Sequence, residues 1–97
     1  MNSLKDPKPE VRYSAARALG KYGAEAREAV PELTDLLKDS DKTVRMGAAY
    51  ALADIGAEAQ SAVSALQGAL RDKDKKVQEA AAYALKKITG KRPTPVK

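Results

Sequence analysis

The sequence contains no cysteine, histidine, tryptophan or phenylalanine among its 97 residues. Without cysteine, neither a disulfide nor a thiolate metal site can hold the fold together. Without histidine, the chain lacks the usual general base and the most common metal ligand. A nucleophile–base pair would need serine with lysine, and neither Ser14 nor Ser61 has a lysine three or four residues away. We therefore expect no enzyme activity, no cofactor and no metal site.

Long apolar runs are also missing. No stretch approaches the roughly 20 apolar residues of a membrane-spanning helix, and the N-terminal MNSLKDPKPE lacks the apolar segment of a secretory signal. We expect one small domain in a reducing, cytoplasmic setting, with no membrane partner. A core without large rings would be built from Ala, Leu, Val and Ile, which suits slender helices in close contact.

What the sequence does contain is one motif, present three times at a spacing of 33 residues. It reads KDPKPEVRYSAARALGKYG from residue 5, KDSDKTVRMGAAYALADIG from residue 38 and RDKDKKVQEAAAYALKKIT from residue 71. Similarity at a fixed period is typical of stacked helical repeats. The same spacing relates Leu4 to Leu37 and Leu70, Asp6 to Asp39 and Asp72, and Val11 to Val44 and Val77.

The period divides the chain into repeat one (about 5–37), repeat two (about 38–70), a half repeat (about 71–90) and a tail (91–97). Each complete repeat is predicted to hold two helices, a first-type and a second-type helix, which gives five helices in all. The second-type helices are expected over about 25–38 and 58–71. Pro31 predicts either a helix start near residues 27–28 or a kink, because proline removes a backbone hydrogen bond.

The first-type helices are predicted from an apolar stripe and from their terminal residues. Val11, Ala15, Ala18, Leu19 and Tyr22 fall on one helical face, so Tyr22 is expected in the core. The positions expected to cap these helices are Asp41 and Asp74 at the start and Gly23 and Gly56 at the end.

The pattern D-x-x-x-x-V-R-x-x-A-A-x-A-L-x-x-[IY]-G, followed by A-V-P-x-L-x-x-L-L-K-D, resembles the HEAT-like repeat of the phycobilin-lyase type. The two parts of the motif cover residues 6–23 and 29–39, and again 39–56 and 62–72, and the resemblance as a whole spans about residues 4–90. The resemblance implies an all-α, right-handed α-solenoid of about two and a half helical hairpins. First-type helices would line its convex side and second-type helices its concave side. Such repeats serve scaffolds, lyase subunits and designed binders, so the resemblance leaves function and a natural or designed origin open.

The third first-type helix has no predicted second-type partner, because the tail KRPTPVK carries two prolines. Each unit of a solenoid buries its apolar face against a neighbour. We therefore expect an open-end apolar stripe to stay partly exposed and to be an interface. Three explanations remain open: a longer array, pairing of this end with itself or another protein, or a tail that folds back. The stripe consists of Val77, Ala81, Leu85 and Ile88.

The predicted concave surface changes along the chain. Glu28, Glu32 and Asp35 of repeat one correspond to Ser61, Ala65 and Gly68 of repeat two. An acidic ridge beside a strip of small residues suits a protein segment, such as a helix with basic and apolar residues. Ordinary variation among surface residues explains the same change.

The predicted convex surface carries a ladder of residue types that are enriched in protein interfaces. The alternative is that neighbouring first-type helices cover one another with these side chains. The ladder consists of Tyr13, Arg17, Met46, Tyr50 and Tyr83.

The net charge of +5 gathers on the first-type helices and at the C-terminal end. We predict a non-enzymatic interaction or scaffold module that binds a protein segment through its concave or open-end surface. One alternative is an accessory subunit or fragment of a phycobilin-lyase-type assembly. Another, which the acidic ridge disfavours because it repels phosphates, is a nucleic-acid accessory protein. The latter would use Lys75, Lys76, Lys86, Lys87, Lys91, Arg92 and Lys97.

Overall fold

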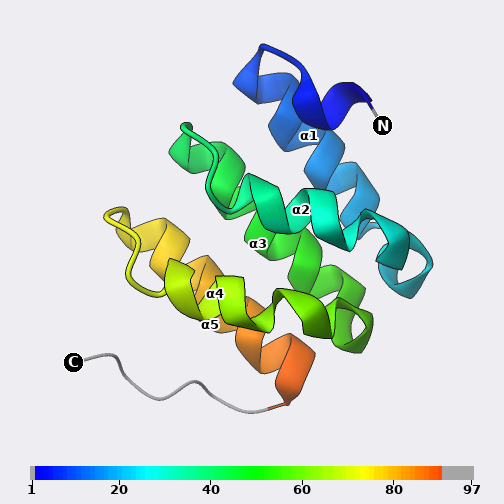
Figure 1. The fold of residues 1–97 in the computed structure, drawn as a ribbon, viewed down its shortest axis with the longest axis vertical. Coiled ribbons are helices and arrows are strands. Elements are labelled where there is room, and N and C mark those ends of the chain that lie inside the picture. Colours follow the sequence, from blue (N-terminus) through cyan, green and yellow to red (C-terminus); the bar gives the residue numbers. More distant parts are fainter. Residues whose placement is uncertain (1, 91–97) are drawn as a thin grey trace.

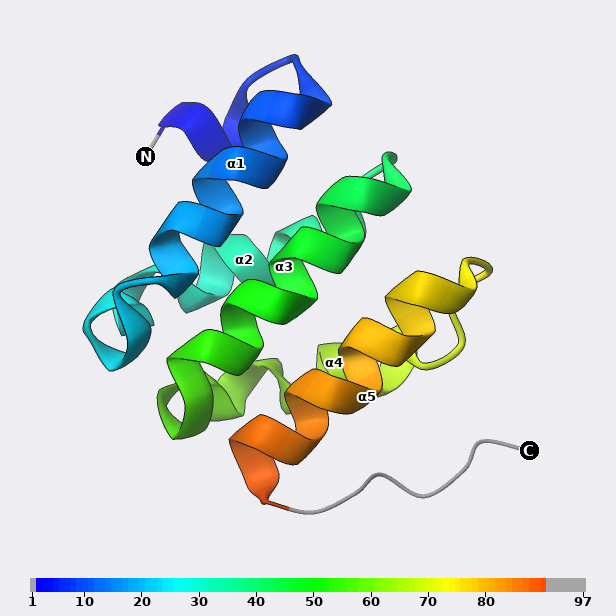
Figure 2. The same cartoon turned by 180° about the vertical axis from the view of Figure 1, so that it is seen from behind.

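The computed structural model describes residues 2–90, which form two layers of helices (Figure 1). The first layer holds α1 (Pro9–Gly20), α3 (Lys42–Ile55) and α5 (Lys75–Thr89), which lie side by side (Figure 2). The second layer holds α2 (Val30–Leu36) and α4 (Val63–Ala69). Three 3-10 helices complete the helical elements of the described residues: η1 (Asn2–Lys5), η2 (Gly23–Ala29) and η3 (Gly56–Ala62). Within residues 2–90 there is no strand, and the predicted all-α solenoid is confirmed.

The predicted N-caps of α3 and α5 are confirmed. The Asp41 carboxylate accepts hydrogen bonds from the backbone N–H groups of Thr43 (2.8 Å) and Val44 (3.1 Å). Asp74 caps α5 in the same way. These bonds satisfy N–H groups that the first turn of a helix leaves unpaired. The repeated aspartates therefore fix where two of the three first-layer helices begin.

Helix α1 ends differently from α3 and α5 at its C-terminus, and this difference leaves Tyr22 outside the helix. Gly56 and Gly90 follow α3 and α5 with φ of 77° and 75°, a conformation that glycine adopts without strain. Helix α1 ends earlier, at Gly20, so Tyr22 lies in the turn beyond it. Tyr22 is 66 % exposed, and its predicted place in the core is wrong.

Each second-type helix is divided into two pieces by a kink, at Ala26 and at Ala59. A kink in the first is one of the two alternatives predicted from Pro31, whereas no division is predicted for the helix over 58–71. A 3-10 helix runs up to Ala29 or Ala62, and a short α-helix follows. Pro31 stands in the first turn of α2, where a missing N–H costs nothing. Ser64 occupies the same position in α4. The division is thus a property of the repeat and does not depend on the proline.

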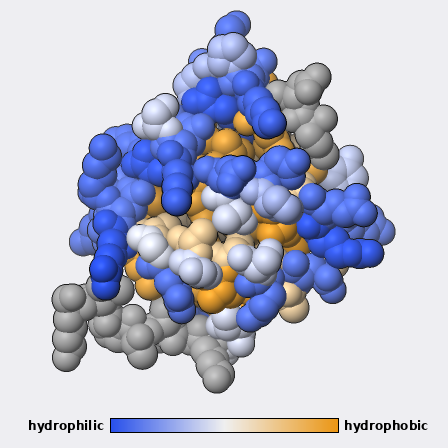
Figure 3. Space-filling model, viewed as in Figure 1, coloured by the Kyte–Doolittle hydropathy of each residue, from blue (hydrophilic) through white to orange (hydrophobic). Residues whose placement is uncertain are grey.

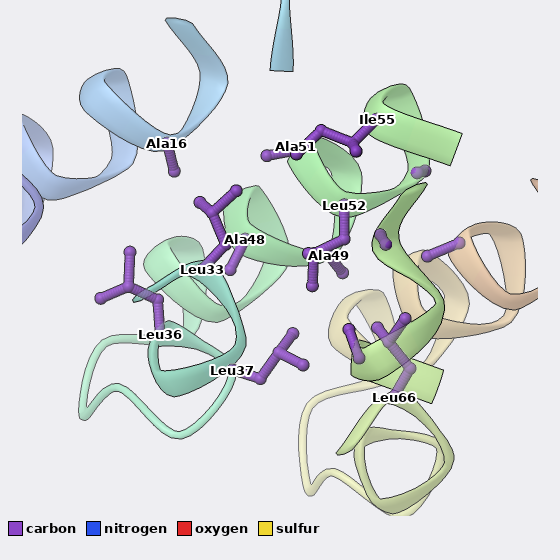
Figure 4. Close-up of a cluster of buried hydrophobic side chains, with 14 of the residues drawn as sticks. Ala16, Leu33, Leu36, Leu37, Ala48, Ala49, Ala51, Leu52, Ile55 and Leu66 are labelled. Carbon is purple, nitrogen blue, oxygen red and sulfur yellow. The ribbon is translucent and has the colours of Figure 1, made fainter. Parts of the chain in front are cut away.

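The core lies between the two layers and runs from repeat one into repeat two. Leu33 and Leu66 of the second layer are completely buried, as is Leu52 of α3. Figure 4 shows these side chains around the alanines of α3, of which Ala48 and Ala49 are also completely buried. Alanine lets neighbouring backbones approach closely, so the layers pack without large rings.

The predicted open-end apolar stripe is buried, which corrects the expectation that part of it stays exposed. Its four residues, Val77, Ala81, Leu85 and Ile88, are 0 to 5 % exposed. Helix α5 packs against α3, η3 and α4 of repeat two. The stripe of a first-type helix therefore faces the preceding repeat, so a missing second-type partner does not uncover it. The tail, 91–97, lies outside the described residues.

Candidate functional site

An open groove of about 990 Å³ lies on the second layer, where repeat two follows repeat one. Its floor includes three residues of the predicted concave set, Ser61, Ala65 and Gly68, which η3 and α4 bring together with Ser64. The turns that follow α2 and α4, at residues 37–40 and 72–73, contribute most of the remaining lining. Figure 3 shows hydrophobic surface on this face, between hydrophilic side chains.

The acidic half of the predicted concave set does not line this groove. Glu28 and Asp35 are exposed and Glu32 is half-buried, on η2 and α2. The structure thus places the six predicted residues on one layer but separates them into the small-residue floor of the groove and an acidic group on repeat one.

Two arginines and two aspartates form a ladder along the groove side of the repeats (Arg12, Asp39, Arg45 and Asp72, the Arg–Asp ladder). Arg12 donates from Nε and Nη2 to the two carboxylate oxygens of Asp39, at 2.9 and 3.1 Å. Arg45 repeats this contact with Asp72, at 2.9 and 3.2 Å. Such paired hydrogen bonds are strong and fix the relative orientation of the two groups. Each pair joins one repeat to the next.

The same arginines also hold the turn of their own repeat. Arg12 Nη1 donates to the carbonyl oxygen of Asp6 at 2.7 Å, and Arg45 Nη1 donates to that of Asp39 at 2.8 Å. Gln78 stands at the third position and donates its amide only to the carbonyl oxygen of Asp72. The half repeat therefore keeps the contact with its own turn and lacks the cation.

The carboxylate of Asp72 shows how the ladder affects ionisation. Burial raises its pKa, but the hydrogen bonds from the Asp74 N–H and from Arg45 outweigh burial, so the pKa of Asp72 is lowered. The carboxylate is thus ionised at neutral pH and satisfied by its partners. The charged side chains of the groove lining that form no ion pair among the described residues are Lys38 and Lys73.

Sequence reasoning missed the Arg–Asp ladder, although a signal for it was present. Aspartate recurs at residues 6, 39 and 72, and arginine recurs at 12 and 45, all in the 33-residue register. The partners lie 27 residues apart in sequence, so they look like separate surface charges until the repeats are stacked. A periodic pair of opposite charges in a stacked array is the signal that predicts such contacts.

The predicted convex ladder lies on the first layer, where contacts link four of its five members, Tyr13, Arg17, Tyr50 and Tyr83. The guanidinium of Arg17 lies 5.3 Å from the ring centroid of Tyr50, and the Tyr50 and Tyr83 rings are 5.7 Å apart. Tyr13 packs over Gly47 of α3. Tyr83 is 45 % exposed, whereas the other members, including Met46, are half-buried. This arrangement matches the alternative in which neighbouring helices cover each other.

Two further features bear on function. Within residues 2–90, no group of three or more acidic residues is placed to hold a metal ion. In the same part of the chain, no helix combines the length and apolar character needed to cross a membrane.

Comparison with known proteins identifies the repeat. A family model described as HEAT repeats matches residues 1–86 of the 97-residue chain. No curated protein matches the sequence.

Proposed function

Because the chain belongs to the HEAT-repeat family, whose repeats generally mediate protein–protein contacts, we propose that it is a non-enzymatic interaction module. It binds a segment of another protein in the groove between its two complete repeats. The observation that carries this proposal is the groove floor, where the four positions that η3 and the middle of α4 contribute to the lining hold only small side chains. These are Ser61, Ser64, Ala65 and Gly68.

The lining defines the chemistry of the segment. Small residues leave space for apolar side chains of a partner, and burial of such side chains drives association. Lys38 and Lys73 favour a carboxylate at the end of the groove next to the turns, because the ladder arginines are already paired. Beyond the groove, Glu28, Glu32 and Asp35 would contact basic residues of the same segment.

A peptide library displayed for selection on the complete chain tests the groove. Peptides that bind are measured again with Gly68→Arg, which fills the floor. A Cβ at Gly68 meets no atom within 4 Å, so the variant should fold. We expect at least a tenfold loss of affinity, or roughly 1.4 kcal/mol, because the arginine occupies space that the peptide needs.

Gln67→Arg is the matched control, since Gln67 is exposed on the same helix and lies outside the groove lining. It adds the same charge and should change affinity by less than about twofold. Equal losses in the two variants, or none in either, would place the binding surface elsewhere and contradict the proposal.

The narrower alternatives lead to separate experiments. If the chain is an accessory subunit of a phycobilin-lyase-type assembly, as the motif at 29–39 suggests, a partner subunit of such a lyase should displace a groove-selected peptide. The chain could instead bind nucleic acid through lysines that are exposed on α5, namely Lys75, Lys76, Lys86 and Lys87. In that case sequence-selective binding should persist at physiological salt. Lys91, Arg92 and Lys97 lie outside the described residues.

A further inference from the structure

The edge of α1 that faces away from α3 exposes residues that are buried at the same positions of α3 and α5. Ala18 is exposed, whereas its equivalents Ala51 and Ala84 are completely buried. Val11 is half-buried, whereas Val44 and Val77 are completely buried. Tyr22 is 66 % exposed, against 4 % for Ile55 and 5 % for Ile88. The apolar stripe of α1 thus lacks the cover that each later first-layer helix has.

The junctions between α1 and α3 and between α3 and α5 show what covers the equivalent stripes of α3 and α5. Across the first junction, α1 presents Arg12, Ala16 and Gly20 to α3, four residues apart on one helical face. Ala16 is completely buried, and a Cβ added at Gly20 would lie 3.0 Å from the Cα of Ala51. Close approach of the two helices therefore requires small residues at the second and third positions.

The second junction follows the same rule. Helix α3 presents Arg45, Ala49 and Ala53 toward α5, and the two alanines are 0 and 1 % exposed. The arginine in each case reaches the aspartate of the following repeat, Asp39 or Asp72. A helix that covers a stripe thus carries arginine, a small residue and a second small residue at intervals of four.

At the α1 edge, Asp6 is the aspartate that corresponds to Asp39 and Asp72. Its carboxylate accepts a hydrogen bond from the Lys8 N–H, as Asp39 does from the Asp41 N–H. Among the described residues no arginine pairs with this carboxylate. The α1 edge therefore combines an exposed apolar stripe with a carboxylate, Asp6, that can accept hydrogen bonds from an arginine. The junctions within the chain have the same combination, with Asp39 or Asp72 as the carboxylate.

A second copy of this chain does not supply the missing helix. The faces with arginine and small residues on α1 and α3 already pack against a neighbouring helix, and of their six residues only Arg12 is not fully buried. On α5 the three positions hold Gln78, Ala82 and Lys86, and Lys86 is exposed. The long side chain of Lys86 occupies the position at which Gly20 and Ala53 allow two helices to approach closely. Gln78 occupies the position of the arginine and has no positive charge to pair with Asp6.

We propose that the α1 edge is a second docking site, and that its occupant is an α-helix of another protein with Arg-x-x-x-small-x-x-x-small on one face. The arginine pairs with Asp6, and the small residues lie over Ala18 in the way that α1 lies over Ala51. This site is distinct from the groove, so each surface can be disproved without affecting the other.

Two helix-stabilised peptides of equal length test the chemistry on the complete chain. One copies residues 38–55 and carries Arg45, Ala49 and Ala53, and the other copies 71–88 and carries Gln78, Ala82 and Lys86. Titration by fluorescence anisotropy should show binding of the first and at least about tenfold weaker binding of the second, because a charge-assisted pair and close packing are both lost.

Variants of the chain locate the site. Asp6→Asn keeps an oxygen that accepts the Lys8 N–H bond and should weaken the first peptide about tenfold. Asp35→Asn removes an exposed carboxylate from the second layer and should leave affinity unchanged. Ala18→Arg should abolish binding, whereas arginine at the exposed Ala57 should not.

Three results would overturn the proposal. The first is equal affinity of the chain for both peptides. The second is an affinity for the first peptide that neither Asp6→Asn nor Ala18→Arg changes. The third is an oligomer of the chain alone in sedimentation that becomes monomeric in the Ala18→Arg variant. In that case another copy of the chain would occupy the α1 edge. Circular dichroism of each variant separates loss of the site from loss of the fold.

Discussion

The helices at the two ends of the first layer, α1 and α5, carry the same apolar stripe but differ in how far that stripe is buried. At the α5 end the stripe is buried, with Ala84 completely enclosed and Ile88 at 5 % exposure. At the α1 end the equivalent Ala18 and Tyr22 are exposed. On α5 the positions that correspond to Arg12, Ala16 and Gly20 instead hold Gln78, Ala82 and Lys86. The stack therefore has a direction, and a residue's contribution depends on the repeat before it.

The largest expected effect compares one repeat position at the two ends. Ile88→Ala should lower the free energy of unfolding by about 3 kcal/mol, because it removes a buried side chain and leaves a cavity. Tyr22→Ala should change it by less than about 0.5 kcal/mol, since the ring is mostly in water. Urea denaturation followed by circular dichroism measures both values. Similar losses in the two variants would contradict the direction of the stack.

The next effect compares the aspartates of the same register. Asp72→Asn should cost about 2 kcal/mol at pH 7, because it leaves the buried Arg45 without its carboxylate. Asp6→Asn should cost only a few tenths of a kcal/mol, since the Asp6 side chain retains its single hydrogen bond as an amide. Thermal or urea unfolding distinguishes these outcomes, and equal costs would show that Asp72 gains nothing from the junction.

The pH dependence sharpens this second prediction. The folded-state pKa of Asp72 lies below its unfolded value, so its ionised form contributes stability that is present above the unfolded value of about 3.9. That contribution is lost as the pH falls through the folded-state pKa. The decline in stability of the wild type below about pH 4 should be steeper than that of Asp72→Asn. Parallel curves would mean that Asp72 has an unperturbed pKa.

The smallest effect compares two helical glycines. A Cβ at Gly47 would lie 2.5 Å from the Tyr13 ring, whereas a Cβ at Gly68 meets nothing within 4 Å. Gly68→Ala should stabilise by about 0.5–1 kcal/mol through helix propensity alone. Gly47→Ala should destabilise by about 1 kcal/mol, because overpacking costs more than propensity returns. A gain in both variants would show that the junction between α1 and α3 is loose.

The sequence predicts the parts of the fold that depend on local chemistry. Repeated aspartates predict the caps at Asp41 and Asp74, and the 33-residue period predicts the five helices and their stacking. For the groove floor, the register aligns Ser61, Ala65 and Gly68 with Glu28, Glu32 and Asp35, and the resemblance to HEAT-like repeats implies that these positions lie on the concave side. The caps follow from local sequence, and the stacking follows from the repetition of one unit.

The features that the sequence does not predict depend on the neighbour. An apolar stripe indicates which face of a helix is buried but not whether the preceding or the following repeat covers it. The sequence alone therefore places the open edge at α5, whereas the structure has it at α1. Tyr22 shares the register of Ile55 but lies beyond the end of a shorter helix. The division at Ala59 is a backbone effect that apolar periodicity does not report, and it occurs without the proline that predicts a kink in repeat one.

Thiol labelling of single-cysteine variants tests the direction of the stack most directly, because the native chain has no cysteine that would react. Ala18→Cys and Ala84→Cys place a thiol at one repeat position on α1 and on α5. Reaction of Ala18→Cys should approach the rate of the unfolded chain, and Ala84→Cys should react on the order of 100-fold more slowly, because its thiol is reached only when the structure opens. Equal rates, or faster labelling of Ala84→Cys, would place the open edge at α5 and contradict the account.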